Sequence, residues 1–217
     1  RSLWSESASG GVRLANPDII RALSPLPESA DEARAIALTL GGGELLLGEQ
    51  ASESELKRRD LSRYQNILFA THGAMASDFV ELGEPGLILT PPAKASELND
   101  GLLTASEIAQ LKLNADLVVL SACNTAAADG TPGAEGLSGL TKSFFHAGAR
   151  NLLVSHWSVV SESTVKLTTG LFEQLKRQPQ LGKSRALQAS MRALLDSGPA
   201  FSHPMYWAPF VLVGDGR

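Results

Sequence analysis

The stretch "DLVVLSACNTAAADGTPGAEG", residues 116–136, decides the fold. Its first part is the most apolar run in the chain, and a short continuous apolar run is typical of a strand buried on both faces of a sheet. The small residues and glycines that follow predict a loop before the next helix. We therefore expect a strand over 116–123 that ends at Cys123, the only cysteine among 217 residues. The chemistry of the molecule depends on whether that thiol is a small core residue or a nucleophile.

Short runs rich in Val, Ile and Leu alternate with helical patterns along the rest of the chain. Strands that alternate with helices predict a mostly parallel sheet covered by helices on both faces. No linker, repeat or low-complexity segment divides the sequence, so we expect one domain over 1–217. The expected strands are 11–16, 44–48, 66–73, 85–92, 116–123, 150–157 and 206–216, and the expected helices are 29–42, 52–60, 104–113, 136–149, 161–178 and 182–198.

Composition excludes several classes of protein. Hydrophobic residues make up 43% of the chain, charged residues 19%, and the net charge is -4, which is typical of an ordinary globular protein. The mild acidity and the lack of a Lys/Arg run argue against a nucleic-acid partner. No apolar run has the length of a signal peptide or a membrane span, so we expect no membrane partner. A single cysteine cannot form an internal disulfide, which favours a cytoplasmic protein, and we expect a bacterial one.

Two expected strands end in reactive side chains. Residues 66–73 end with Thr71, His72 and Gly73, and residues 116–123 end with Cys123. Chemistry in open α/β sheets gathers past the carboxyl ends of the strands, so neighbouring parallel strands would bring His72 and Cys123 to one edge. Histidine can activate a thiol, and the separation of about 50 residues resembles that of the caspase histidine and cysteine. Gly73 lacks a side chain, which would leave its backbone N–H open to a substrate oxygen. The alternative interpretation of Cys123 is that it is a small buried hydrophobic residue and not a nucleophile.

These residues resemble the CHAT domain, a caspase-like family associated with tetratricopeptide repeats and grouped with caspases and separases. The likeness covers almost the whole chain. It is carried by "FATHG" (69–73), "LVVLSACNTA" (117–126), "EGLSGLTKSFFHAGARNLLVSHWSV" (135–159) and the closing "HPMYWAPFVLVG" (203–214). Because the last segment resembles the final strand of the family and the sequence begins without Met, we expect the C-terminal part of a longer protein.

The resemblance implies a caspase-like three-layer α/β sandwich with a six-stranded, mostly parallel sheet between helices. It implies that Cys123 is the nucleophile and His72 the general base and acid, with the backbone N–H groups of Gly73 and Cys123 as the oxyanion hole. The expected activity is that of a cysteine endopeptidase that cleaves selected protein substrates through a thioester acyl-enzyme. No cofactor and no metal are implied, and four scattered histidines with one cysteine do not form a zinc site.

The resemblance also implies a substrate pocket. Its wall is expected at Ser121, His156, Trp157 and Ser158. Several relatives prefer basic residues, which an acid at the pocket floor would explain. Four acidic residues are available for this position, although the sequence does not assign any of them to the pocket floor. For each of them, the alternative is a solvated charge on a loop. They are Asp78, Asp100, Glu135 and Glu162.

Two other functions stay open. The first is a catalytically silent caspase-like scaffold, against which the intact His72, Gly73 and Cys123 count. The second is a nucleotide-binding domain, which is disfavoured because "GTPGAEGLSGL" (130–140) lacks the Walker lysine and the G-x-G-x-x-G spacing. For the peptidase we expect a protein substrate and, as a further partner, N-terminal repeats or an activating protein.

Overall fold

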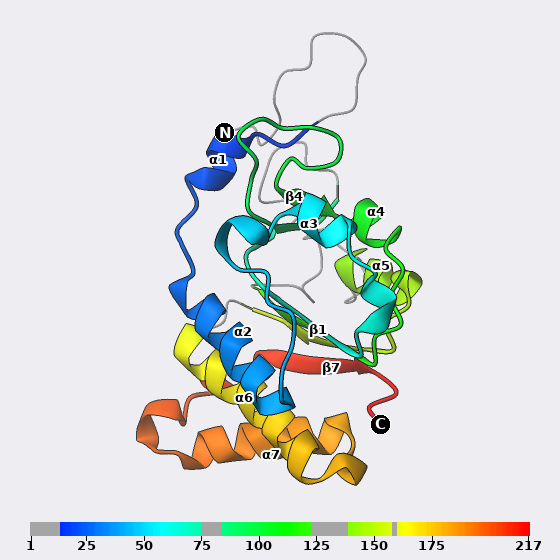
Figure 1. Ribbon diagram of the computed structural model, residues 1–217. Coiled ribbons are helices and arrows are strands. Elements are labelled where there is room, and N and C mark those ends of the chain that lie inside the picture. The colour runs from blue at the N-terminus through cyan, green and yellow to red at the C-terminus, as the bar shows by residue number, and fades with distance from the viewer. Residues whose placement is uncertain (1–13, 75–83, 123–138, 158–159) are drawn as a thin grey trace, which may run out of the picture.

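The computed structural model describes residues 14–74, 84–122, 139–157 and 160–217 (Figure 1). Its central element is a four-stranded sheet in the order β1-β5-β6-β7. The first three strands are parallel and β7 runs antiparallel to β6. The prediction of a mostly parallel sheet is therefore confirmed. The strands are β1 (Asn66–Ala70), β5 (Leu117–Ser121), β6 (Asn151–Ser155) and β7 (Phe210–Gly214).

A second, antiparallel sheet has the order β2-β3-β4. The six-stranded sheet implied by the resemblance is thus not confirmed, since the strands of the described residues divide into four and three. The expected strand at 85–92 shrinks to β3, and β4 was not predicted. These strands are β2 (Gly73–Ala74), β3 (Gly86–Ile88) and β4 (Leu102–Thr104).

Two predicted strands differ in the described residues. The expected strand at 11–16 is described only from residue 14, where Ala15 forms a single β-bridge and its backbone N–H donates to a carboxylate oxygen of Asp100 at 2.6 Å. The helix α1 (Pro17–Arg21) follows directly. The expected strand at 44–48 has no regular structure before Gly48, and the Glu44 side chain binds Arg59 and Tyr64.

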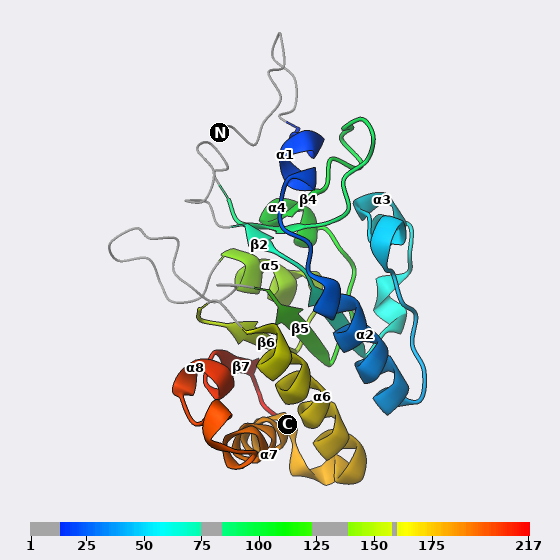
Figure 2. The same cartoon turned by 90° about the vertical axis from the view of Figure 1, so that its left-hand side faces the viewer.

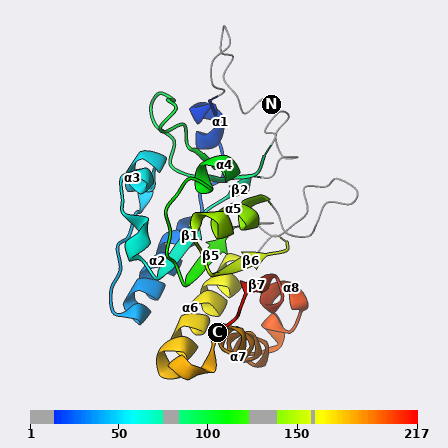
Figure 3. The same ribbon diagram turned by 90° about the vertical axis from the view of Figure 1, so that its right-hand side faces the viewer.

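Helices cover both faces of the four-stranded sheet (Figures 1 and 3). One face is covered by α2, α6 and α7, and α2 and α6 run side by side (Figure 2). The other face is covered by the shorter helices α3, α4 and α5. These helices are α2 (Pro27–Leu40), α3 (Glu53–Lys57), α4 (Ala105–Ile108), α5 (Gly139–Ala147), α6 (Ser161–Arg177) and α7 (Lys183–Asp196); the remaining turns are η1 (Gly48–Gln50), η2 (Leu61–Arg63), η3 (Pro179–Leu181), η4 (Pro199–Phe201) and α8 (Pro204–Trp207).

The side chains of β5 alternate between two hydrophobic clusters. Val118 and Leu120 pack in the cluster that contains Phe144 of α5. Leu117 and Val119 pack in the cluster of α2, α6 and α7. All five side chains of the strand are buried, which confirms the prediction of a strand with two buried faces.

Helix ends follow local chemistry. Thr104 and Glu107 form a reciprocal capping box at the start of α4, and Ser52 caps α3 through the N–H of Glu55 at 3.4 Å. Because the chain after Ile108 tightens into i→i−3 bonds, α4 ends well before the expected residue 113. Gly148, with φ +112°, ends α5; a Cβ there would lie 2.3 Å from the carbonyl oxygen of Leu113.

Candidate active site

The register of β1 and β5 aligns the two proposed catalytic positions. Ala70 pairs with Ser121, and the N–H of Thr71 continues the ladder by donating to the Ser121 carbonyl at 3.2 Å. His72 follows Ala70 by two residues, just as Cys123 follows Ser121 by two residues. Cys123 itself lies outside the described residues. His72 therefore lies where the sequence predicts it, at the carboxyl end of β1 beside β5.

A backbone carbonyl fixes the tautomer of His72. Its Nε2 lies 2.8 Å from the carbonyl oxygen of Ser24, in the segment between α1 and α2. Because a carbonyl can only accept, Nε2 must carry a proton, and the neutral ring then keeps its lone pair on Nδ1. The backbone of His72 is also held, since its carbonyl accepts from the N–H of Ile88 at 2.9 Å. The ring is thus prepared to take a proton at Nδ1.

Gly73 lies in β2, opposite Leu87 in an antiparallel ladder. The bond from Ile88 N–H to the His72 carbonyl makes the preceding pair a hydrogen-bonded one. Hydrogen-bonded and non-hydrogen-bonded pairs alternate along such a ladder, so the Gly73 N–H points away from β3. This direction leaves it available as one donor of an oxyanion hole. The second expected donor, the N–H of Cys123, lies outside the described residues.

Ser121 is buried and binds an acid that the sequence analysis missed. Its hydroxyl donates to Oε2 of Glu32 at 2.8 Å, and Glu32 Oε1 lies 2.8 Å from Oγ1 of Thr168 on α6. Burial raises the pKa of Glu32, while the hydroxyls of Thr168 and Ser121 act in the opposite direction. The available signal was the placement of Glu32 four residues before the buried Ile36, which puts a carboxyl on the apolar face of α2.

Two expected pocket residues lie exposed at the carboxyl end of β6. The rings of His156 and Trp157 stack at 6.5 Å between centroids, and the His156 N–H donates to the Pro209 carbonyl at 2.9 Å. Since β6 is parallel to β5, both rings lie past the same edge of the sheet as His72. Ser158 lies outside the described residues.

The acids considered for the pocket floor lie elsewhere or outside the described residues. Glu162 is exposed and pairs with Lys166 on its own helix at 2.7 Å. Asp100 accepts from the backbone N–H groups of Ala15 and Leu102. Asp78 and Glu135 lie outside the described residues. Within the described residues, neither Glu162 nor Asp100 forms a hydrogen bond or ion pair with His72.

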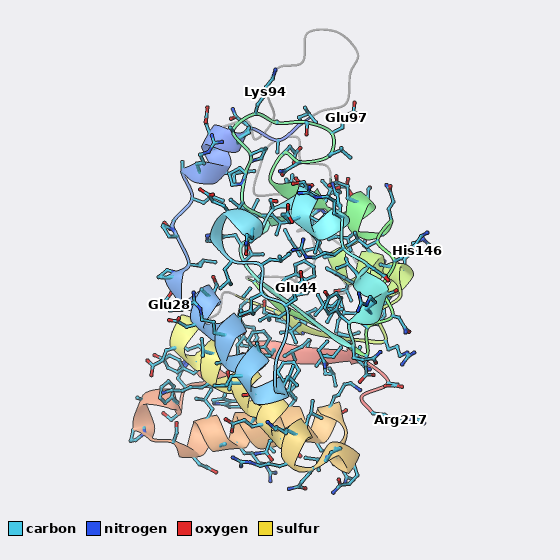
Figure 4. All side chains as sticks on the ribbon, viewed as in Figure 1. Glu28, Glu44, Lys94, Glu97, His146 and Arg217 are labelled. Atoms are coloured by element: carbon cyan, nitrogen blue, oxygen red, sulfur yellow. The ribbon has the colours of Figure 1, made fainter. Side chains whose placement is uncertain are left out.

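A cavity of about 690 Å³ borders the free edge of β1. The odd-numbered residues of β1 bond to β5, as the bond from Thr71 N–H to Ser121 shows, so the N–H and C=O groups of Leu68 and Ala70 point toward the cavity. Glu44, labelled in Figure 4, is one of the residues that line it. His72 also lines the cavity, and apolar side chains from α2, its leading segment, the segment before η1 and β3 complete the wall; representative residues are Leu26, Ala33, Leu47 and Ile88.

The other histidines and the acids of the described residues form no cluster of three or more side chains that could hold a metal ion. His146 points away from α5 into solvent (Figure 4), and His203 caps α8 by accepting the Met205 N–H at 3.2 Å. Among the described helices, none combines the length and the apolar character needed to cross a bilayer.

The fold and this edge of the sheet define the class: an α/β protein with a histidine at the carboxyl end of one parallel strand and a cysteine following the next. The chain belongs to the CHAT domain family, which it matches over residues 5–215. It is 29% identical to tetratricopeptide repeat protein 28 of Mus musculus and 28% identical to the Homo sapiens protein of the same name, over 97% of this chain in each case. The match covers only 10% of each relative. Both relatives are mammalian and give no support to the bacterial source expected above, which stays a prediction.

Proposed function

We propose that this chain is a cysteine endopeptidase of the CHAT family with Cys123 as nucleophile and His72 as general base and acid. The observation that carries the proposal is the register of β1 and β5. Two residues beyond the pair Ala70–Ser121, one strand leads to His72 and the other to Cys123. The bond from Nε2 to the Ser24 carbonyl supports the role of His72, because it leaves Nδ1 as the basic nitrogen.

The reaction begins when Nδ1 of His72 accepts the proton of the Cys123 thiol. The thiolate attacks the scissile carbonyl carbon and the carbonyl π electrons move to oxygen, where the N–H groups of Gly73 and Cys123 stabilise the oxyanion. The imidazolium returns its proton to the leaving amine as the C–N bond breaks, which yields a thioester. Water then gives its proton to His72, adds to the thioester and releases the acid, and Cys123 recovers its proton.

The substrate side of the proposal rests on the exposed pair His156 and Trp157 past the same edge. Ser121 and Ser158 stay proposed pocket residues beside them. We also propose that residues 1–217 form a single CHAT domain within a longer, cytoplasmic protein. N-terminal repeats or an activating partner would regulate it. The complete sheet of the domain would be the six-stranded caspase-like sheet. The tetratricopeptide repeat names of both relatives support the repeat context.

The test is cleavage of a diverse peptide library, with mass spectrometry of the products, by the wild type and by Cys123→Ala. The expected result is cleavage by the wild type alone with one dominant residue before the cut. Alkylation of Cys123 by iodoacetamide tests the dyad without a substrate: it should be fast near neutral pH and slowed at least tenfold by His72→Ala. Equal alkylation rates in these two proteins, together with no cleavage, would favour the silent caspase-like scaffold instead.

A further inference from the structure

Glu32 is a buried carboxyl that the mechanism above does not use. Its side chain is 3% exposed, and both carboxyl oxygens contact hydroxyls, one from β5 and one from α6. We infer that Glu32 is a positioning residue of the proposed active site, which holds the end of β5 at the distance from His72 that proton transfer needs. This inference rests on the proposed peptidase function and adds a residue to it.

Glu32 can influence the positions of both proposed catalytic residues because of where α2 and its leading segment lie. Glu32 lies on α2, and the segment that leads into α2 supplies the Ser24 carbonyl on His72. The same carboxyl accepts from Ser121, two residues before Cys123. One helix and its leading segment therefore contact the ends of both strands that carry the proposed dyad. A change in the bond at Glu32 shifts the end of β5 relative to α2, and with it relative to the carbonyl that orients His72.

Each polar proton of the Ser121, Glu32 and Thr168 side chains has an acceptor when Glu32 is protonated and therefore neutral. The Ser121 hydroxyl donates to one carboxyl oxygen. The Thr168 hydroxyl lies 2.8 Å from the other carboxyl oxygen and 2.9 Å from the Thr164 carbonyl, so its single proton faces two acceptors. A protonated Glu32 would donate to Thr168 and leave the Thr168 proton for Thr164. An ionised Glu32 would need the Thr168 proton for itself, and that bond to Thr164 would be lost. The chain from β5 through α2 to α6 is complete only in the neutral form.

Neighbouring charged side chains on α2, which carries Glu32, and on α6, which contacts it, pair with each other and not with Glu32. On α2, Asp31 and Arg34 pair with each other in an exposed position. On α6, Glu162 and Lys166 do the same. The end of β5 contributes the Ser121 hydroxyl. A buried carboxylate without a cation is costly, which agrees with the raised pKa of Glu32.

The experiment compares Glu32→Gln with Glu32→Ala by the rate of Cys123 alkylation with iodoacetamide between pH 5 and pH 9. Glutamine keeps one acceptor for Ser121 and one donor for Thr168, so its profile should stay within about threefold of the wild type. Alanine removes both bonds, so its rate at neutral pH should fall at least tenfold and its profile should move toward that of a free cysteine, near pH 8.5. Ser163→Ala, which removes another buried hydroxyl of α6, one that donates to the carbonyl of the N-cap residue Val160, is the matched control and should leave the profile unchanged.

The outcomes separate the inference from the proposed function. If His72→Ala alkylates like the wild type, there is no activated dyad, and both the proposed function and the role of Glu32 are overturned. If alkylation depends on His72 but Glu32→Ala keeps the wild-type profile, the dyad stands and the positioning role is wrong. A glutamine variant as slow as the alanine variant would also overturn the neutral-acid role. If Glu32→Ala fails to fold, Thr168→Val takes its place with the same expected direction; it removes the Thr168 contacts with Glu32 and Thr164 but keeps the bond between Ser121 and Glu32.

Discussion

Asp100 is a carboxyl whose charge works against the fold. Its oxygens accept from the N–H groups of Ala15 and Leu102, at 2.6 and 2.9 Å, and thereby hold the segment before α1 to the start of β4. Burial raises its pKa to about 6; the two backbone bonds act in the opposite direction, and the nearby charges of Glu53 and Glu107 add to the rise. The folded protein therefore binds this proton more tightly than the unfolded chain does.

The sign of the pH dependence follows from that difference. A carboxyl with a raised pKa in the folded state lowers the free energy of unfolding as it ionises, and here that loss develops between about pH 4 and about pH 6. Asp100→Asn cannot ionise. We expect its melting temperature, relative to that of the wild type, to rise as the pH increases across this window.

Thermal unfolding at half-unit steps of pH measures that difference, with Leu38→Ala, a change at an exposed position that cannot ionise, as the control. The control should differ from the wild type by a constant amount across the window. A melting-temperature difference for Asp100→Asn that does not change with pH, or that falls, would show that this carboxyl carries no such linkage.

At the scale of single elements, β1 has two unlike edges. One edge bonds to β5, and the other borders the cavity of about 690 Å³. The N–H groups of Ile67, Phe69 and Thr71 are directed to β5, whereas those of Leu68 and Ala70 are directed to the cavity. We expect hydrogen exchange at Leu68 and Ala70 to be at least tenfold faster than at their odd-numbered neighbours.

Residue-resolved exchange of the native protein measures this alternation, and the neighbouring residues of the same strand serve as the control. Uniform protection along β1 would contradict the free edge. It would mean that another strand pairs there, as the six-stranded sheet implied by the family resemblance requires.

The elements that the sequence predicted well are those with two buried sides or a long periodic pattern. The apolar run of β5 fits few structures other than a buried strand. The pattern of α6, which places Leu167 and Leu171 on one buried face, fits few structures other than an amphipathic helix. Residues 44–48 were mistaken for a strand because an apolar run does not reveal whether a ladder partner exists. The Ser24 carbonyl on His72 could not be predicted, since a backbone acceptor has no sequence signal. The sequence did not single out Glu32, and its contacts became visible only when the fold placed Ser121 and Thr168 beside it.

For the whole molecule, the four-stranded sheet joins two hydrophobic clusters that do not share side chains. Ile108 of α4 lies in one cluster and Ile36 of α2 lies in the other, on opposite faces of β5. Both are buried, so Ile→Val at either site should cost about 0.5–1.5 kcal/mol through the lost methyl group. Because the two sites lie in different clusters, the double variant should lose the sum of the two costs to within about 0.5 kcal/mol.

Guanidinium unfolding of the wild type, both single variants and the double variant, followed by circular dichroism, measures these costs. We expect one transition in all four proteins, because β5 contributes side chains to both clusters and neither face can lose its cover without exposing the shared strand. Leu38→Ala, a truncation at an exposed position of α2, is the control and should change the free energy of unfolding by less than about 0.5 kcal/mol. Two transitions, one moved by Ile36→Val and the other by Ile108→Val, would instead show that the layers unfold independently and that the single-domain organisation is wrong.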